Sequence, residues 1–242
     1  LKGKGVRWNR DDVTQCYMSM GGIPYYLDNI HSDASSYPKA IDQMFFSKDG
    51  ILRAEYNMLY KSLFTNSNVY EAIVEQLAKK KMGMTLNELS DATKIQWGGH
   101  LTEYLENLER CGFVRKYNAY GNKKKGTIYQ LTDLYTLFYL QFVKENVSTD
   151  GAYWQTMTDS PSRRAWAGYA FEILCLTHIG QIRNALGFAS VSCTASAWKT
   201  EPTEEHDGAQ IDLVIDRRDQ IVNLCEMKFS TAKYAIDAKS EE

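Results

Sequence analysis

The order of elements predicted between residues 67 and 131 constrains the fold of this chain more than any other feature. Three helices are expected first, in NVYEAIVEQLAKKK, TLNELSDATK and GGHLTEYLENLERCG. The first and third carry apolar residues at helical spacing, and Thr85 with Glu88 predicts a capping box at the start of the second. Two strands around a hairpin rich in Gly and Lys are then expected in FVRKYNAYGNKKKGTIYQLTD. Three helices followed by a β-hairpin describe a winged helix-turn-helix.

The segments on either side differ from this one in pattern and charge. Residues 1–66 read as helical, and GGIP at residues 21–24 is expected to break the first helix. After residue 133 we expect an aromatic-rich helix, a long helix over 162–186, and strands near 188–197, 210–216 and 221–229. Net charge is +1 over residues 1–66, +3 over 67–130 and −6 over 131–242. These shifts predict an α+β multi-domain protein divided at 1–66, 67–132 and 133–242.

Composition excludes several classes of protein. The five cysteines among 242 residues are scattered and never form C-x-x-C, which argues against a disulfide framework and a structural zinc site. No apolar run approaches the roughly 18 residues of a membrane span, and no signal peptide is present. We therefore expect a cytoplasmic protein without a membrane partner. The start at Leu1 rather than Met suggests a fragment.

The middle segment leaves two kinds of partner open. Lys123, Lys124 and Lys125 at the expected wing tip suit contacts with DNA phosphates. The third helix, however, carries three glutamates against a single arginine between residues 96 and 112, whereas recognition helices present neutral or basic faces. A protein-interaction or positioning role is therefore favoured for that helix, with sequence-specific DNA reading the alternative.

Charged residues interrupt the two apolar strands of QIDLVIDRRDQIVNLCEMKFS, residues 210–230. Because alternate residues of a strand share a face, Glu226 and Lys228 are expected to project together, and Asp212 to share its face with Val214 and Asp216. The opposite faces are apolar and expected to form core. Asp212 opposes Glu226 only if the hairpin loop has an odd number of residues, such as 217–221 or 218–220, or contains a bulge. A two-residue turn at 218 and 219 would instead oppose Asp212 to Cys225.

Three motifs together carry a resemblance to a known family. MGGIPYYL near residue 22, WAGYAFEILC near residue 170 and the strand pair IDLVIDRRDQIVNLCEMKFS occur in the order found in archaeal-type ATPases of the AAA+/STAND kind. In that family a helical lid, a winged helix and a domain similar to PD-(D/E)XK nucleases follow a P-loop ATPase domain. Gly22 and Pro24 match the lid element that lies near the nucleotide. This chain has no Walker motif, so ATP would be bound only by the full-length protein. It also ends soon after the E-x-K strand.

The resemblance implies a metal-dependent nuclease site. Glu172 matches the helix carboxylate of the motif, and with Asp212 and Glu226 it would hold Mg²⁺ through oxygen ligands. Asp212, Glu226 and Lys228 are the candidate catalytic residues, with Lys228 orienting the attacking water or stabilising the phosphorane charge. The expected function is to couple nucleotide state to nucleic-acid or partner binding, with possible cleavage. The alternative is a non-catalytic DNA- or protein-binding regulatory module with a relic nuclease fold, because the acidic charge would repel nucleic acid without bound metal.

Overall fold

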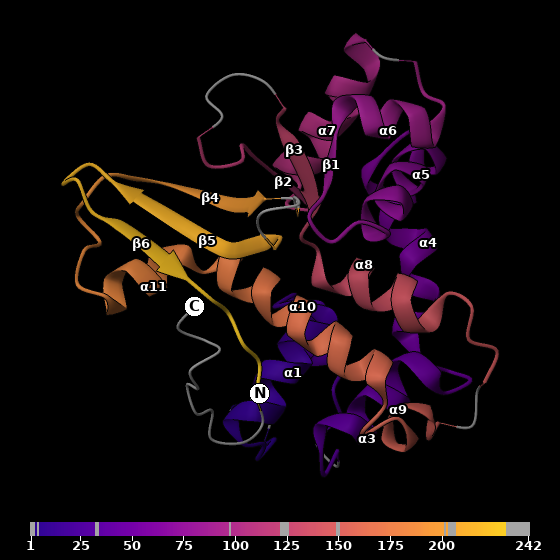
Figure 1. Cartoon of the computed structure of the whole chain (residues 1–242). Coiled ribbons are helices and arrows are strands. Elements are labelled where there is room, and N and C mark those ends of the chain that lie inside the picture. The colour runs from indigo at the N-terminus through magenta and orange to yellow at the C-terminus, as the bar shows by residue number, and fades with distance from the viewer. Residues whose placement is uncertain are drawn as a thin grey trace.

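The computed structural model describes residues 3, 5–31, 34–96, 98–121, 126–148, 151–200, 202 and 207–230. Helices are combined with two antiparallel sheets of three strands each, so the expected α+β class is confirmed (Figure 1). One continuous cluster of buried residues extends from Val6 to Ile215 and includes residues of all three segments. The expected wing-tip lysines Lys123, Lys124 and Lys125 lie outside the described residues.

The first 64 residues form helices that pack on elements from later in the chain. They are α1 (Arg10–Met20), α2 (Pro24–Asp28), α3 (Tyr37–Ile41), the π-helical turn η2 (Asp42–Phe46) and α4 (Ile51–Leu63). The Asn9 side chain caps α1 by accepting the N–H of Asp12 at 2.7 Å. Gly21, at φ 69°, ends α1 and donates its N–H to the Tyr17 carbonyl, so the expected helix break is present.

Residues 134–156 pack against these first helices. They form α8 (Leu134–Phe138), the π-helical turn η3 (Tyr139–Val143) and α9 (Tyr153–Thr156). The Tyr135 hydroxyl donates to the Leu52 carbonyl at 2.9 Å, and the hydroxyls of Tyr60 and Thr136 lie 3.0 Å apart. Trp154 is fully buried, and the buried Trp166 meets it edge-on, with ring centres 5.4 Å apart. These contacts join the N-terminal helices to the helix that carries Glu172.

The middle segment has the expected element order. It contains α5 (Ser67–Ala78), β1 (Met84–Thr85), α6 (Leu86–Thr93), α7 (Gly99–Arg110), β2 (Val114–Tyr117) and β3 (Ile128–Leu131), with the strands ordered β1–β3–β2. The Thr85–Glu88 capping box is present at the start of α6. On α7, Glu103 and Glu106 are exposed, and Glu109 forms an ion pair with Lys116 of β2 at 2.7 Å. The acidic surface expected for this helix is therefore present.

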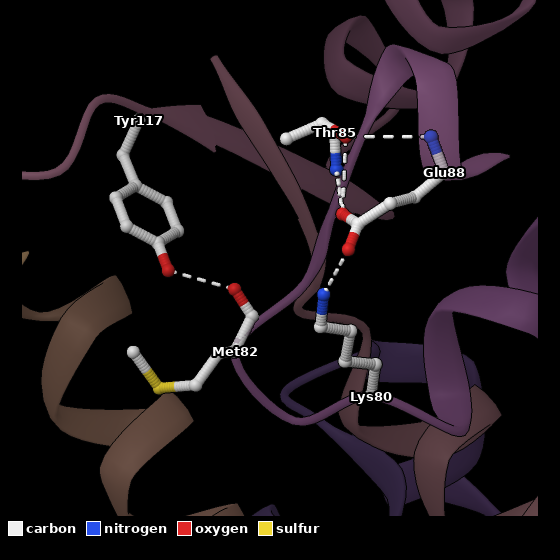
Figure 2. A network of polar contacts seen from close by, with 5 residues as sticks. All are labelled: Lys80, Met82, Thr85, Glu88 and Tyr117. Carbon is white, nitrogen blue, oxygen red and sulfur yellow. Dashed lines mark hydrogen bonds and ion pairs between the residues drawn. The ribbon is translucent and has the colours of Figure 1, made fainter. Parts of the chain in front are cut away.

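The turn at residues 80–83, between α5 and β1, is fixed by polar contacts (Figure 2). Lys80 forms an ion pair with Glu88, whose carboxylate also accepts the N–H of Thr85 at 2.8 Å. The Tyr117 hydroxyl donates to the Met82 carbonyl at 2.7 Å. Gly83 adopts φ 80°, and a Cβ there would lie 2.3 Å from the Tyr129 carbonyl oxygen. This turn is consequently a defined support for Lys81.

The last segment places a small sheet against two helices. It contains α10 (Pro161–Thr177), α11 (Ile179–Ala185), β4 (Cys193–Thr200), β5 (Ala209–Arg217) and β6 (Val222–Cys225), with the strands ordered β4–β5–β6. Figure 1 shows the sheet over α10 and α11, and buried residues of both layers belong to the common core. The helix expected over 162–186 is broken at His178, whose Nδ1 lies 2.8 Å from the Leu174 carbonyl oxygen and closes the end of α10.

The faces of β5 follow the expected alternation, except that Val214 is also buried on the face that carries Asp212. Leu213 and Ile215 are buried in the core, and Cys225, Met227 and Phe229 pack against it while half-buried. Among the described helices, none is both long and apolar enough for a membrane span.

Candidate functional site

The hairpin between β5 and β6 has the register on which the site hypothesis depends. Leu213 pairs with Cys225 and Asp216 with Val222, so a five-residue connection, 217–221, joins the strands. Gln220 adopts φ 66°, and the Arg217 N–H donates to the Ile221 carbonyl at 3.0 Å. A left-handed residue at the end of a three-residue turn is a common hairpin geometry. The odd connection gives the register in which position 226 follows on the Asp212 side, but the pairing ends at Leu213 and Cys225, so Glu226 lies just beyond the strand.

Asp212 is half-buried and takes part in the strand pairing through its side chain. Its Oδ2 accepts the N–H of Met227 at 3.0 Å, just beyond the point where the backbone pairing of β6 ends. The Gln210 amide donates to Oδ1 at 3.4 Å. The carboxylate is thus held at the edge between the sheet and the following segment, residues 226–230.

Glu226 and Lys228 project together, as expected, and form an ion pair with each other. Both side chains are about half exposed, at 52% and 53%. The residues between and after them, Met227 and Phe229, turn toward the core, and the Phe229 ring lies 5.6 Å from that of Phe171 on α10. The segment after β6 therefore crosses α10 with its charged pair facing solvent.

Glu172 comes to the site from α10. Its pKa is raised from 4.5 to about 7, first by burial and next by the negative charge of Asp212, with a smaller contribution from Glu226. The positive charges of Arg115 and Lys81 act in the opposite direction. The fold thus places the three predicted carboxylates within electrostatic reach of one another.

Lys81 and Arg115 were not predicted as site residues, and both come from the middle segment. The Lys81 carbonyl accepts the Gln130 amide at 2.7 Å and the Tyr169 hydroxyl at 3.0 Å, and its ammonium group lies 5.4 Å from the centre of the Tyr169 ring. Arg115 is mostly buried, which lowers its pKa. The run of three lysines at residues 79–81 is a sequence signal that could have indicated an anion-binding site, but such a run is also typical of a solvated helix end.

A pocket of about 290 Å³ lies between α10, the end of the sheet and the turn that carries Lys81. Glu172, Asp212 and Lys228 line it together with Lys81, whereas Glu226 is not among its lining residues. Gly168 and Ala165, one and two turns before Glu172 on α10, also line it. The pocket therefore brings two carboxylates, two ammonium groups and the Arg164 guanidinium from three parts of the chain to one opening.

The donor set suits a hard divalent cation only in part. The carboxylates of Glu172 and Asp212 offer only oxygen, the kind of ligand that Mg²⁺ prefers, and the negative charge of Asp212 acts on Glu172. Within the described part of the chain, however, no three His, Cys, Asp or Glu side chains lie close enough together to hold a metal ion. Glu172 and Asp212 would be the ligands, and Glu226, paired with Lys228, contributes negative charge from outside the pocket.

The lid-like element lies at the surface. Gly22 and Pro24 are both exposed where α1 ends and α2 begins, and the neighbouring Tyr25 is 59% exposed. A Cβ on Gly22 would lie 2.8 Å from the Tyr17 ring, so this position favours glycine. Neither residue lines the pocket at Glu172.

We expect Glu172→Gln to stabilise the metal-free protein at pH 8. Because burial raises the folded-state pKa of Glu172, the contribution of this group to stability is most favourable below about pH 4.5 and is lost as pH rises through about 7, where the buried carboxylate ionises. The gain at pH 8 should be on the order of 1 kcal/mol after allowing for solvent screening, or a few degrees in Tm. Thermal unfolding in EDTA at pH 5 and pH 8 measures it.

The matched control is Glu103→Gln, which neutralises an exposed glutamate on α7. This variant should follow the wild-type profile at both pH values. Equal stability of wild type and Glu172→Gln at pH 8 would show that Glu172 carries no unfavourable charge in the folded protein.

No family model, no curated protein and no solved structure matches this chain. The assignment of a function therefore depends on the geometry of the pocket and on the motif order.

Proposed function

We propose that the pocket at Glu172 and Asp212 binds a phosphodiester of a nucleic acid and, with a divalent cation, hydrolyses it. The observation that carries this proposal is the pocket lining, because Glu172 of α10 and Asp212 of β5 reach one opening from different elements together with Lys81 and Lys228. The negative charge of Asp212 acts on Glu172 across this opening.

The chemistry divides between the carboxylates and the ammonium groups. Bound at Glu172 and Asp212, a divalent cation would polarise the phosphodiester and lower the pKa of a bound water. The Met227 N–H holds one oxygen of Asp212 and so orients the carboxylate. Lys81, on its fixed turn, supplies a positive charge for the phosphate, and Lys228 supplies a second from the rim.

The finer architecture belongs to the same proposal. The element order α5, β1, α6, α7, β2, β3 is that of a winged helix. The order α10, β4, β5, β6, with carboxylates on α10 and β5 and an E-x-K sequence after β6, is similar to PD-(D/E)XK nucleases. The middle segment acts here by delivering Lys81 and Arg115 to the site.

A cleavage assay tests this function. Single-stranded and duplex DNA and RNA are incubated with the 242-residue chain and Mg²⁺ or Mn²⁺. We expect metal-dependent cleavage that EDTA stops. No cleavage of any substrate by folded protein, with either metal, would contradict it.

A second candidate is a non-catalytic module that binds nucleic acid or protein. The ion pair between Glu226 and Lys228 favours it, because it occupies both groups of the E-x-K sequence with each other. This module would bind its partner equally well with and without metal, and would cleave no nucleic acid with either Mg²⁺ or Mn²⁺.

On the resemblance to archaeal-type ATPases, we also propose a nucleotide contact near the N-terminal end of the chain. Gly22, Pro24 and Tyr25 form an exposed element that would meet the nucleotide bound by a P-loop domain in the full-length protein. Through the common core, which runs from α1 to α10, nucleotide state would then reach the pocket.

A further inference from the structure

A second, larger hollow adjoins the pocket described above. It measures about 530 Å³, within the range of about 300–1,000 Å³ that is usual for ligand sites. Its walls are the end of α5, the helical turns α8 and η3, and the first half of α10. Leu137, Leu140 and Trp166 are apolar side chains in its lining.

The charged side chains that line this hollow are mainly lysines. Lys79, Lys81 and Lys144 line it against one acid, Glu75, and that acid already pairs with Lys144 at 2.8 Å. Lys79 and Lys81 come from residues 67–130, which carry +3, and Lys144 from residues 131–242, which carry −6. A cationic hollow that also has apolar lining residues is complementary to an anion with a flat apolar group.

The two hollows are continuous along α10. Lys81, Ala165 and Tyr169 line both of them. An anionic chain that lies across Lys81 therefore has the carboxylate pair on one side and the apolar hollow on the other. Lys81 is the point at which the two sites would share a phosphate.

We propose that the hollow between α5, η3 and α10 is a subsite for one unpaired nucleotide next to the phosphodiester held at Glu172 and Asp212. The inference rests on the proposed function and narrows the substrate class to single-stranded nucleic acid, including unpaired ends. An unpaired base can leave its neighbours and enter an apolar hollow, whereas a base in a duplex is stacked on both faces. The lysines at the rim would bind the flanking phosphates.

This arrangement gives the middle segment a nucleic-acid contact that does not use α7. That helix presents Glu103 and Glu106 to solvent, which a polyanion avoids. Lys79 instead lies at the C-cap of α5, and Lys81 lies within the fixed turn at residues 80–83, part of which Figure 2 shows. The expected partner therefore approaches along α10.

Fluorescence anisotropy in EDTA tests the subsite without catalysis. The probes are fluorescein-labelled dT12 and a blunt duplex of the same length. We expect wild type to bind dT12 at least tenfold more tightly than the duplex. Lys79→Glu should weaken binding of dT12 at least tenfold, and Gln141→Trp, which fills the hollow from the exposed side of η3, at least fivefold.

The control is Lys61→Glu, which reverses an exposed lysine on α4 outside both hollows and should stay within twofold of wild type. Equal or tighter binding of the duplex, or wild-type affinity in both subsite variants, would overturn the subsite. Asp212→Asn separates the two proposals, because it should bind dT12 normally but not cut it. If dT12 binding depends on Lys79 while cleavage is absent from wild type, the subsite stands and the nuclease proposal fails.

Discussion

Asp212→Asn should reduce metal-dependent cleavage by at least about 100-fold, or roughly 2.7 kcal/mol of transition-state stabilisation. The substitution removes the negative charge of Asp212, which affects the pKa of Glu172 more than any other charged group does. It keeps an oxygen that can still accept the Met227 N–H, so the hairpin should remain intact. Initial rates at saturating Mg²⁺, with circular dichroism as a check on folding, measure the effect.

Asp216→Asn is the matched control for this prediction. Asp216 lies on the same strand and the same face, four residues away, but is exposed and pairs in register with Val222. Its substitution should leave the rate within about twofold, since a surface change away from the site has little effect. Equal losses in both variants would indicate a general electrostatic effect rather than a site at Asp212.

Asp42→Ala should cause the largest loss of stability that the described contacts predict. Asp42 is fully buried on η2, and its carboxylate accepts the N–H groups of Trp154 and Gln155 at 2.6 and 3.0 Å and the Gln155 amide at 2.9 Å. It thereby caps the first turn of α9 from more than a hundred residues away. Removing it leaves the buried Trp154 N–H and the two partly buried Gln155 donors without their acceptor, at a cost of about 3 kcal/mol.

A loss of that size lowers Tm by roughly 6–12 °C in a chain of this length, which differential scanning calorimetry resolves. The control is Asp49→Ala, an exposed aspartate in the turn before α4, which should change Tm by no more than a degree or two. A Tm for Asp42→Ala within that range would mean that solvent replaces the carboxylate and that the junction between η2 and α9 is open.

Local patterns were sufficient to predict most of the elements near the site. The Thr85–Glu88 box, the break at Gly21 and the alternation in β5 each depend on contacts between residues close in sequence, so their outcome could be derived from residue type alone. The sequence leaves the register of the β5–β6 hairpin open, because a five-residue connection and a two-residue turn both suit the residues DRRDQI. The structure selects the odd connection.

Long-range contacts could not be predicted in the same way. Nothing near Lys81 in the sequence indicates that its carbonyl would bond Tyr169, 88 residues later, and so bring its ammonium group to Glu172. Asp42 likewise gives no sign of its partners in α9. The ion pair between Glu226 and Lys228 follows from their alternate positions in the sequence. Only the pocket lining, which includes Lys228 but not Glu226, shows that this ion pair leaves Glu226 outside the pocket.

The most direct test of the central claim is a calorimetric titration of Mn²⁺ into wild type and Asp212→Asn in metal-free buffer. The account predicts binding of about one ion by wild type and at least a tenfold loss of affinity in the variant, because Glu172 and Asp212 are the ligands. No heat of binding from folded wild type, or equal affinity in the two proteins, would contradict a metal site at these carboxylates and favour the non-catalytic module.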